Sequence, residues 1–532
     1  MAKQSRQQTV PQTSLFPFLP EAVNHAYAGL AIAALFFIVM VFIGLKYHIV
    51  GDYGVETDFY WSYVPEARHI LEGKIPIEDF RGPGYPLVLA CIALFTSDLF
   101  HAGVVLSSLA AAASLFFIFQ ILKKLFRADL ALIGTLIVAV NTTFVQYSYS
   151  AGTDMFFVAL VTASTFFFLR HDQARWSNIV ISALLAGLAY LTRYNGLFAA
   201  AAAPLAILAA NPFQQAWKVR AKTAAVYLGV FLLTIAPWGI YCLIEKGSFF
   251  YNKNYLNIAY EMFAKGKIGW DQYWSVDAQK FTSLTQVIFA DPGLFISTVV
   301  RNLFDHAVSD LGKLLGWQIG IFSLLGIPLF VKERPNPRIL SYFVLALVFF
   351  AVLLLVFYGE RFSMYLLPVY VILALKTLTW QRLARYRFWK RVQSGALIGI
   401  VLLVWTAVNS YKFNSANIGS GPREVVSIGQ WFRSNYDDTA RNQIIIARKP
   451  HIAYYLDMKM ELFPYVETYP QLLEQIRKVH ASYLYFSLME AGMRPQFQYL
   501  LDPGKAPPEL RPLTYSTYPP AVLYKVESGP KP

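Results

Sequence analysis

The chain alternates long apolar runs with short polar connections. A helix needs about 20 mainly apolar residues to cross a bilayer core about 30 Å thick. Eleven runs meet or nearly meet this length, at 26–46, 102–122, 130–149, 154–170, 177–192, 195–211, 222–244, 313–331, 339–358, 362–379 and 394–411. The pattern predicts an α-helical polytopic membrane protein with about eleven transmembrane helices.

A further apolar run at 82–97 is shorter and opens with Gly-Pro-Gly-Tyr-Pro. Lys and Arg normally concentrate in cytoplasmic loops. If 82–97 does not cross and the N-terminus is cytoplasmic, the basic connections all lie inside, at 123–127, 170–175, 218–222, 332–338 and 382–391. We therefore predict a re-entrant or juxtamembrane segment at 82–97 on the outer face, in a plasma (inner) membrane protein.

Three regions are predicted on the outer, non-cytoplasmic side. A transmembrane domain, 1–411, carries a first outer loop at 47–101 and a second at 245–312. Within the first loop, Asp58–Leu71 is amphipathic at helical spacing. Residues 412–532 hold no apolar span and predict a small soluble α/β domain in the periplasm or outside the cell. Its expected strands are 443–447 and 521–526, and its expected helices are 425–434 and 469–479.

Composition agrees with a membrane protein, since 56% of residues are hydrophobic and only 15% are charged. The net charge of +14 lies in the predicted inner connections. It is therefore an orientation signal next to membrane lipids and does not indicate nucleic acid as a partner. Cys91 and Cys242 both lie in apolar runs, which fits neither a metal site nor a secreted disulfide. Sequence motifs for nucleotide hydrolysis and the common hydrolases are absent.

Charged residues in short outer connections are costly unless they are paired or hydrated. Four such clusters stand out, around Glu56 and Asp58, Asp154, Arg193 and Arg361. Each has a structural alternative. Asp58 or Thr57, and Thr153 or Asp154, could cap helices; Arg193 could snorkel to the interface; and Arg361 could pair with Glu360. Two carboxylates and two arginines around one outer pocket would suit a lipid-linked phosphate donor and a hydroxyl acceptor.

Several motifs in this order resemble the membrane-embedded GT-C glycosyltransferases of the family 39 type. These include protein O-mannosyltransferases, the aminoarabinose transferase of lipid A and RgtA/B/C/D-like enzymes. The motifs are an acidic first loop with Asp58, Tyr60 and Tyr63, then 67–73 (ARHILEG), 81–86 (RGPGYP), 150–154 (SAGTD), 187–196 (GLAYLTRYNG) and 361–368 (RFSMYLLP). Glu56-Thr57-Asp58 stands where that family usually has an adjacent Asp-Glu.

The resemblance implies a glycosyltransferase that moves a hexose or pentose from a polyprenyl-phosphate-linked donor to a hydroxyl, with inversion. Asp58 would be the general base, and Arg193 and Arg361 would hold the phosphate. Asp154 would orient the sugar, the acceptor or a divalent cation, which Asp58 and Asp154 could ligate through oxygen. The predicted substrate-binding residues are Glu56, Tyr60, Tyr63, Arg81, Tyr147, Arg193 and Arg361.

The acceptor implied by the resemblance is an envelope glycan, a lipid or a protein. Two other classes remain open on the sequence. Many spans with a few buried charges also fit a transporter or lipid flippase, and the tail at 412–532 would also fit a non-catalytic membrane scaffold. The unusual charges lie at one face and no repeated half is evident, which favours the transferase.

Overall fold

The apolar runs form a bundle of roughly aligned helices in a computed structural model, which describes residues 26–171, 176–333, 335–388, 392–436 and 443–527. In these ranges, six segments are long and apolar enough to cross a membrane alone. They are α1 (Ala26–Lys46), α4 (Leu99–Leu125), α7 (Thr153–Arg170), α10 (Trp217–Lys246), η9 with α17 (Glu360–Leu366 and Leu367–Leu378), and the segment that begins with α19 (Ser394–Gly419).

The other predicted spans are also helical. Helices α5 (Ala128–Ala139) and α6 (Thr142–Tyr149) form one span bent by 63°. Four are shorter apolar helices: α8 (Ser177–Thr192), η3 to η4 (Tyr194–Ala210, with α9 at Phe198–Leu205), α15 (Trp317–Lys332) and α16 (Pro337–Leu353). The polytopic helical architecture is confirmed, and the chain is a multi-pass membrane protein.

The second outer loop contains more helix than the sequence predicts. It holds α11 (Tyr255–Ala259), η5 (Tyr260–Ala264), α12 (Trp270–Gln272), η6 (Tyr273–Asp277), η7 (Ala278–Lys280), α13 (Leu284–Ala290), α14 (Pro292–Ser309) and η8 (Asp310–Leu314). Helix α13 and Pro292–Leu314 are apolar enough together to span, but are bent by 97°. Asp291 makes this break, because its carboxylate caps α14 at Leu294 N, 2.8 Å away. Treating 245–312 as a loop without a span therefore missed a broken span or re-entrant pair.

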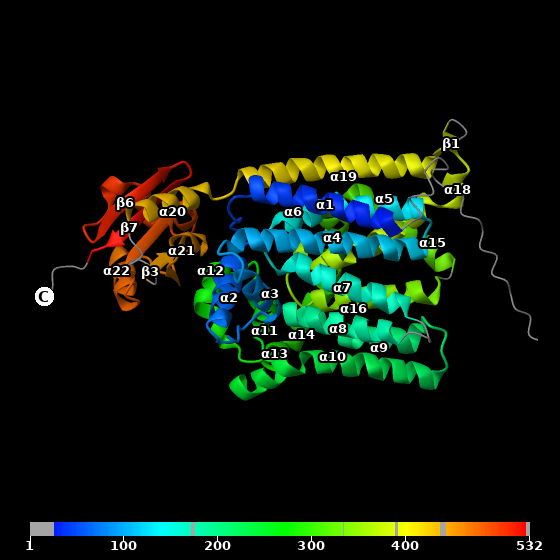
Figure 1. Ribbon diagram of the computed structural model, residues 1–532. Helices are drawn as coiled ribbons and strands as arrows, with labels where there is room; N and C mark the ends of the chain where they lie inside the picture. The colour runs from blue at the N-terminus through cyan, green and yellow to red at the C-terminus, as the bar shows by residue number, and fades with distance from the viewer. Residues whose placement is uncertain (1–25, 172–175, 334, 389–391, 437–442, 528–532) are drawn as a thin grey trace, which may run out of the picture.

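The first outer loop folds against the end of the bundle. Its amphipathic stretch forms η2 (Phe59–Tyr63) and α2 (Val64–Leu71), which bury Phe59, Tyr63 and Ala67 as the periodicity predicts. Residues 82–97 yield α3 (Gly84–Ala93), whose 10 residues are too short to cross a bilayer. Helix α3 packs beside α2 at this end of the bundle (Figure 1), as expected for a juxtamembrane segment.

The C-terminal domain is an α/β sandwich. Its five strands run in the order β4-β3-β5-β7-β6, with β3 parallel to β4 and β5, and β7 antiparallel to β5 and β6. The strands are β3 (Ile444–Ala447), β4 (Lys459–Leu462), β5 (Tyr483–Ser487), β6 (Leu510–Thr517) and β7 (Pro520–Val526). One face packs on α20 (Arg423–Asn435) and α21 (His451–Leu456), and the other on α22 (Tyr469–Lys478), α23 (Leu488–Met493) and η11 (Pro495–Leu501), which η12 (Pro503–Lys505) follows.

Alternation along β3 explains the two layers, since Ile445 and Ala447 face one set of helices and Ile446 the other. The two predicted strands and two predicted helices of this domain are all present. The last long helix, α19, continues to Gly419, past the predicted boundary at 411.

Both outer loops and the C-terminal domain gather at the same end of the helix bundle (Figure 1). We call this the loop end. Helix α18 (Gln381–Ala384) and the β1–β2 hairpin (Arg387–Phe388 and Val392–Gln393) lie at the opposite end, among the basic connections. The separation agrees with the two sides that the charge pattern predicts.

Candidate functional site

Asp58 and Arg81 form an ion pair inside the first outer loop. Arg81 Nη2 lies 2.6 Å from Asp58 Oδ1, and Arg81 Nη1 donates to Glu78 Oε1 at 3.0 Å. The Arg81 guanidinium also lies over the ring of Tyr63, 5.5 Å from its centroid. Asp58 is the N-cap residue of η2 but makes no side-chain capping bond. The cap alternative is therefore wrong for Asp58, because its carboxylate turns to Arg81.

The segment around Arg81 is fixed from two sides. Asp79, two residues earlier, accepts bonds from Lys253 Nζ at 2.7 Å and Tyr251 Oη at 2.6 Å, both in the second outer loop. On the other side, Gly82 lies against the end of α8, where an added Cβ would be 2.1 Å from the Leu191 carbonyl oxygen. Only glycine permits this approach, and it brings Arg81 next to the helix end that carries Arg193.

Asp154 is the shared counter-ion of two arginines. Arg193 Nη1 donates to Asp154 Oδ1, and Arg361 Nη1 lies 4.0 Å from Asp154 Oδ2. Both guanidiniums also lie against the ring of Phe362, 5.3 Å and 4.9 Å from its centroid. Gly152 is the N-cap residue of α7, so neither Thr153 nor Asp154 takes the capping position and the cap alternative is wrong here too. Arg193 is ion-paired rather than snorkelling.

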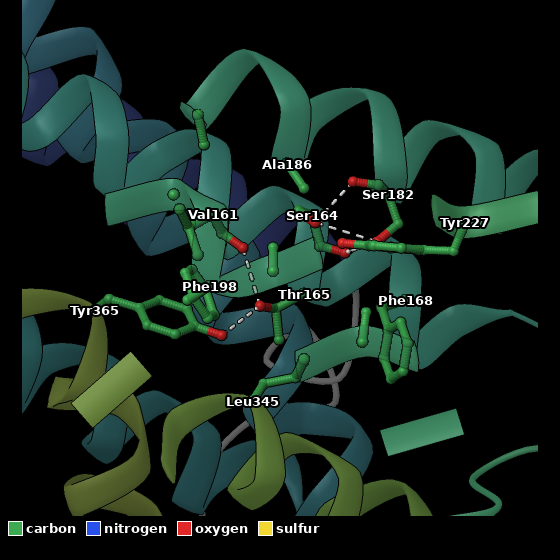
Figure 2. A pocket seen from close by; sticks show the side chains of 14 residues that line it. Val161, Ser164, Thr165, Phe168, Ser182, Ala186, Phe198, Tyr227, Leu345 and Tyr365 are labelled. Carbon is green, nitrogen blue, oxygen red and sulfur yellow. Dashed lines mark hydrogen bonds between the residues drawn. The ribbon is translucent and has the colours of Figure 1, made fainter. Parts of the chain in front are cut away.

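The short helix with Arg361 is anchored by tyrosines on both sides. Tyr358 and Tyr370 donate to the two oxygens of the buried Asp310, at 3.0 and 2.7 Å. Tyr365 shares a 2.8 Å hydrogen bond with Thr165 of α7 in the wall of a small, mostly apolar cavity that Phe198 and Leu345 also line (Figure 2). These contacts hold Arg361 at a fixed place relative to α7, the helix that carries Asp154 in its first turn.

The two ion-pair groups form one cluster. Tyr63 Oη lies 3.2 Å from Thr153 Oγ1, which also accepts a 3.4 Å bond from Arg193 Nη1. Burial raises the pKa of Asp58, but the charges of Arg81, Arg361 and Arg193 lower it more, so the pKa lies below its ordinary value. Asp58 therefore stays ionised and faces three guanidiniums. We call Asp58, Arg81, Asp154, Arg193 and Arg361 the arginine cluster.

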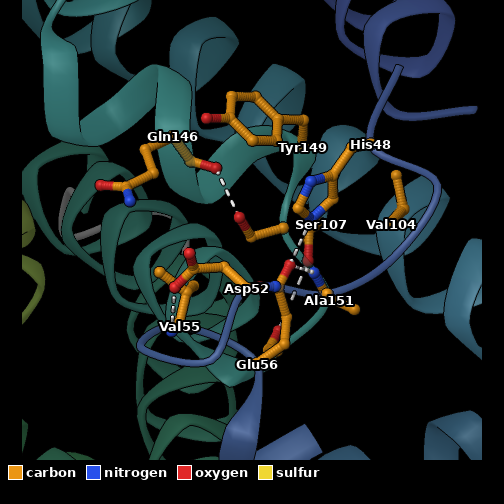
Figure 3. A network of polar contacts seen from close by, with 12 residues as sticks. His48, Asp52, Val55, Glu56, Val104, Ser107, Gln146, Tyr149 and Ala151 are labelled. Atoms are coloured by element: carbon orange, nitrogen blue, oxygen red, sulfur yellow. Dashed lines mark hydrogen bonds and ion pairs between the residues drawn. The ribbon is translucent and has the colours of Figure 1, made fainter. Parts of the chain in front are cut away.

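Glu56 lies outside this cluster and is fully buried. Its carboxylate contacts His48 Nε2 at 2.7 Å and accepts from the backbone amides of Asp52 at 2.7 Å and Ala151 at 3.2 Å (Figure 3). These bonds tie the first outer loop to the turn before α7, where Asp154 lies. This supports a structural role for Glu56, and its predicted contact with substrate stays a prediction.

Tyr60 and Tyr147 occupy different surroundings. Tyr60 is buried between the first outer loop and the C-terminal domain, with its ring 4.5 Å from that of His451 and its hydroxyl accepting from Gly51 N at 3.2 Å. Tyr147 is half-buried in α6, close enough to Arg361 and Asp154 for electrostatic interaction. Tyr147 and Tyr63 thus border the arginine cluster, whereas Tyr60 packs at the domain boundary.

Sequence reasoning missed three carboxylates near the site. Glu78 pairs with Arg81, and Asp310 anchors the Arg361 segment. Glu66, in α2, is buried and accepts a bond from Ser62, and burial raises its pKa to about 7. The acidic residues at 66 and 78 were visible in the same loop as Asp58, but helical spacing alone does not show which of them faces inward.

Both carboxylates of the cluster are paired with arginines, and the possible cation between Asp58 and Asp154 stays a prediction. Asp58 is paired with Arg81, and Asp154 with Arg193 and Arg361. Across the described ranges, no three His, Cys, Asp or Glu side chains are grouped so that they could hold a metal ion. The positive charge beside these carboxylates in the structure comes from guanidinium groups.

Comparison with known proteins supports one fold. Residues 81–241 match the family model of dolichyl-phosphate-mannose-protein mannosyltransferase. No curated protein sequence matches the chain. Among solved structures, the chain is similar to ArnT from Cupriavidus metallidurans in the apo state, with a TM-score of 0.58 and 14% identity over 96% of this chain and 100% of that one.

Two further structures carry a lipid phosphate. ArnT from Cupriavidus metallidurans bound to undecaprenyl phosphate has a TM-score of 0.56 at 14% identity, over 95% of this chain and 99% of that one. The archaeal oligosaccharyltransferase AglB from Archaeoglobus fulgidus, in complex with an inhibitory peptide and a dolichol-phosphate, has a TM-score of 0.58 at 14% identity, over 95% and 75%. The chain therefore has the fold of the GT-C type membrane glycosyltransferases over nearly its whole length.

Proposed function

We propose that the protein transfers a sugar from a polyprenyl-phosphate-linked donor to a hydroxyl group at the loop end, which is the non-cytoplasmic side. The observation that carries this proposal is the arginine cluster, in which three guanidiniums and two carboxylates meet at one end of a GT-C fold. A guanidinium matches phosphate oxygens in shape and charge. The undecaprenyl phosphate and dolichol-phosphate bound by structural neighbours support a lipid-phosphate donor.

In the proposed reaction, the acceptor oxygen attacks the anomeric carbon while the bond from that carbon to the phosphate oxygen breaks. The electron pair leaves with polyprenyl phosphate, and the configuration inverts. Arg193 and Arg361 stabilise the charge that grows on the leaving phosphate. Each then exchanges part of its contact with Asp154 for contact with phosphate oxygens.

Asp58 accepts the acceptor proton in this scheme. Its Oδ1 is held by Arg81, which directs Oδ2 towards the acceptor hydroxyl. A pKa below the ordinary value keeps Asp58 ionised at physiological pH, and the proton moves as the attack makes the hydroxyl acidic. In this scheme, the guanidiniums of Arg193 and Arg361 supply positive charge at the leaving phosphate.

The test uses purified protein in proteoliposomes, a labelled polyprenyl-phosphate sugar and membranes from a strain that lacks the protein. Asp58→Asn should lower transfer about 100-fold or more, while binding of polyprenyl phosphate is kept. The matched control is Asp98→Asn, which removes an outer carboxylate paired with His101 and should leave transfer unchanged. Transfer by Asp58→Asn at the wild-type rate would refute the proposal. Substrate flux without transfer would favour a transporter.

A further inference from the structure

A dipeptide of the C-terminal domain contacts both outer loops. Arg448 and Lys449 directly follow β3. Lys449 Nζ donates to the Tyr53 carbonyl oxygen at 2.6 Å and to Thr57 Oγ1 at 2.9 Å, both in the first outer loop. Arg448 Nη2 lies 3.1 Å from Asp271 Oδ1 of the second outer loop, and Asp271 also pairs with Arg494.

The domain presents this dipeptide from a rigid base. Arg448 N donates to Glu490 Oε1 at 2.6 Å, and Pro450 immediately precedes α21. Helix α21 is itself packed on the first outer loop, because Tyr455 Oη donates to the Ile49 carbonyl oxygen at 3.1 Å. Lys449 therefore reaches the loop from a fixed position.

The contact falls on the turn that carries Asp58. Thr57 Oγ1 donates to the Tyr53 carbonyl oxygen at 2.6 Å, so Lys449, Tyr53 and Thr57 form a closed set of bonds directly before Asp58. Burial lowers the pKa of Lys449 to about 8 with help from Arg448, while the charges of Asp58 and Asp52 oppose this lowering. The amine is thus costly to bury, and its bonds to the turn offset part of that cost.

We propose that Lys449 is a positioning residue for Asp58: by holding the Tyr53–Thr57 turn, it fixes the direction of the Asp58 carboxylate. The C-terminal domain is then part of the catalytic unit. This inference rests on the proposed function, and it assigns to the domain a role beyond covering the loops.

A docking contact elsewhere provides the matched control. Arg68 Nη1 of α2 pairs with Asp457 Oδ1 of the C-terminal domain at 2.9 Å, away from the Tyr53–Thr57 turn. Arg68→Met removes an interdomain bond and a charge, as Lys449→Met does. Only Lys449→Met frees the turn before Asp58.

Two measurements on the full-length protein test the inference. Lys449→Met should raise hydrogen exchange at 52–58 and lower kcat for sugar transfer about 10- to 100-fold through misplacement of Asp58, with the KM for the lipid donor nearly unchanged. Arg68→Met should change neither. Thr57→Val should reproduce the Lys449→Met effect, and the double variant should be no worse than either single one.

Equal exchange at 52–58 in Lys449→Met and wild type, or a rise in the donor KM with kcat unchanged, would overturn the inference. If Lys449→Met does not fold, Thr57→Val tests the same contact from the loop side, and wild-type kcat in that variant would overturn it. Failure of the wild-type protein to transfer sugar would instead overturn the proposed function. If the wild-type protein transfers sugar, any failure of the variant predictions concerns the role of Lys449 alone.

Discussion

Replacing Asp154 by Asn removes the shared counter-ion of Arg193 and Arg361 while keeping the side-chain shape. Asp154 is buried, with Arg193 bonded to one oxygen and Arg361 Nη1 4.0 Å from the other. Removal of one partner from a buried ion pair costs about 3–5 kcal/mol. We therefore expect Asp154→Asn to lower the free energy of unfolding by about 3 kcal/mol in the absence of ligand.

The same change should strengthen the binding of polyprenyl phosphate. If the arginines hold the donor phosphate, the phosphate competes with Asp154 for them. A charge-assisted hydrogen bond contributes about 1.5–3 kcal/mol. Removal of this competition should therefore favour phosphate binding by about 1–2 kcal/mol, or roughly 5- to 30-fold in Kd. Asp154→Asn should therefore lower the stability of the protein and raise its affinity for polyprenyl phosphate, which is also the product. Turnover should fall as well, because polyprenyl phosphate would be released more slowly.

The assay is thermal unfolding in detergent over a titration of polyprenyl phosphate, which gives stability and affinity together. Glu261→Gln is a matched control, because Glu261 is a fully buried carboxylate shared by Lys265 at 2.8 Å and Arg301 at 3.0 Å in the second outer loop. It should lower stability without changing polyprenyl phosphate affinity. Weaker phosphate binding by Asp154→Asn would refute the competition and with it the assignment of Arg193 and Arg361 to the phosphate.

Three further substitutions test how the loop end is held. Glu66→Gln should stabilise the protein above pH 7 by about 1–3 kcal/mol. Burial raises the folded-state pKa of Glu66 to about 7 from 4.5, so the folded protein favours the neutral carboxyl. The stability that the neutral carboxyl contributes is full below pH 4.5 and is lost as the pH rises to 7, because the buried carboxyl group must then ionise. Melting curves at pH 5 and pH 8 should thus show a benefit from Glu66→Gln that grows with pH, and an equal benefit at both would contradict this. Glu56→Gln should lower the free energy of unfolding by about 2–4 kcal/mol, because the NH2 group of glutamine would face an N–H donor that now bonds to the carboxylate. Glu72→Gln changes an exposed carboxylate and should cost almost nothing. Gly82→Ala should cost about 1–3 kcal/mol and depress transfer, because its Cβ meets the Leu191 carbonyl. Gly269→Ala, with no atom within 4 Å of the added Cβ, should be silent, and wild-type behaviour of Gly82→Ala would argue against the close approach.

The sequence by itself determined the helices and indicated that the unusual charges gather at one end of the bundle. Each of the eleven apolar runs is mainly helical, because a long apolar run can satisfy its backbone groups in lipid only as a helix. The cost of isolated charges in short connections also singled out Asp58, Asp154, Arg193 and Arg361. These four residues do meet, although they come from four separate parts of the chain.

Only the tertiary structure decided how these charges pair. Spacing along one helix cannot show that Asp58 turns to Arg81 rather than capping η2, because the partner lies across a loop that Gly82 brings against α8. The tertiary structure also brings Asp310 under the Arg361 segment and Lys449 to the turn before Asp58. The bond between Lys449 and Tyr53 joins residues 396 positions apart. Such contacts depend on packing between elements, which local hydrophobic pattern does not encode.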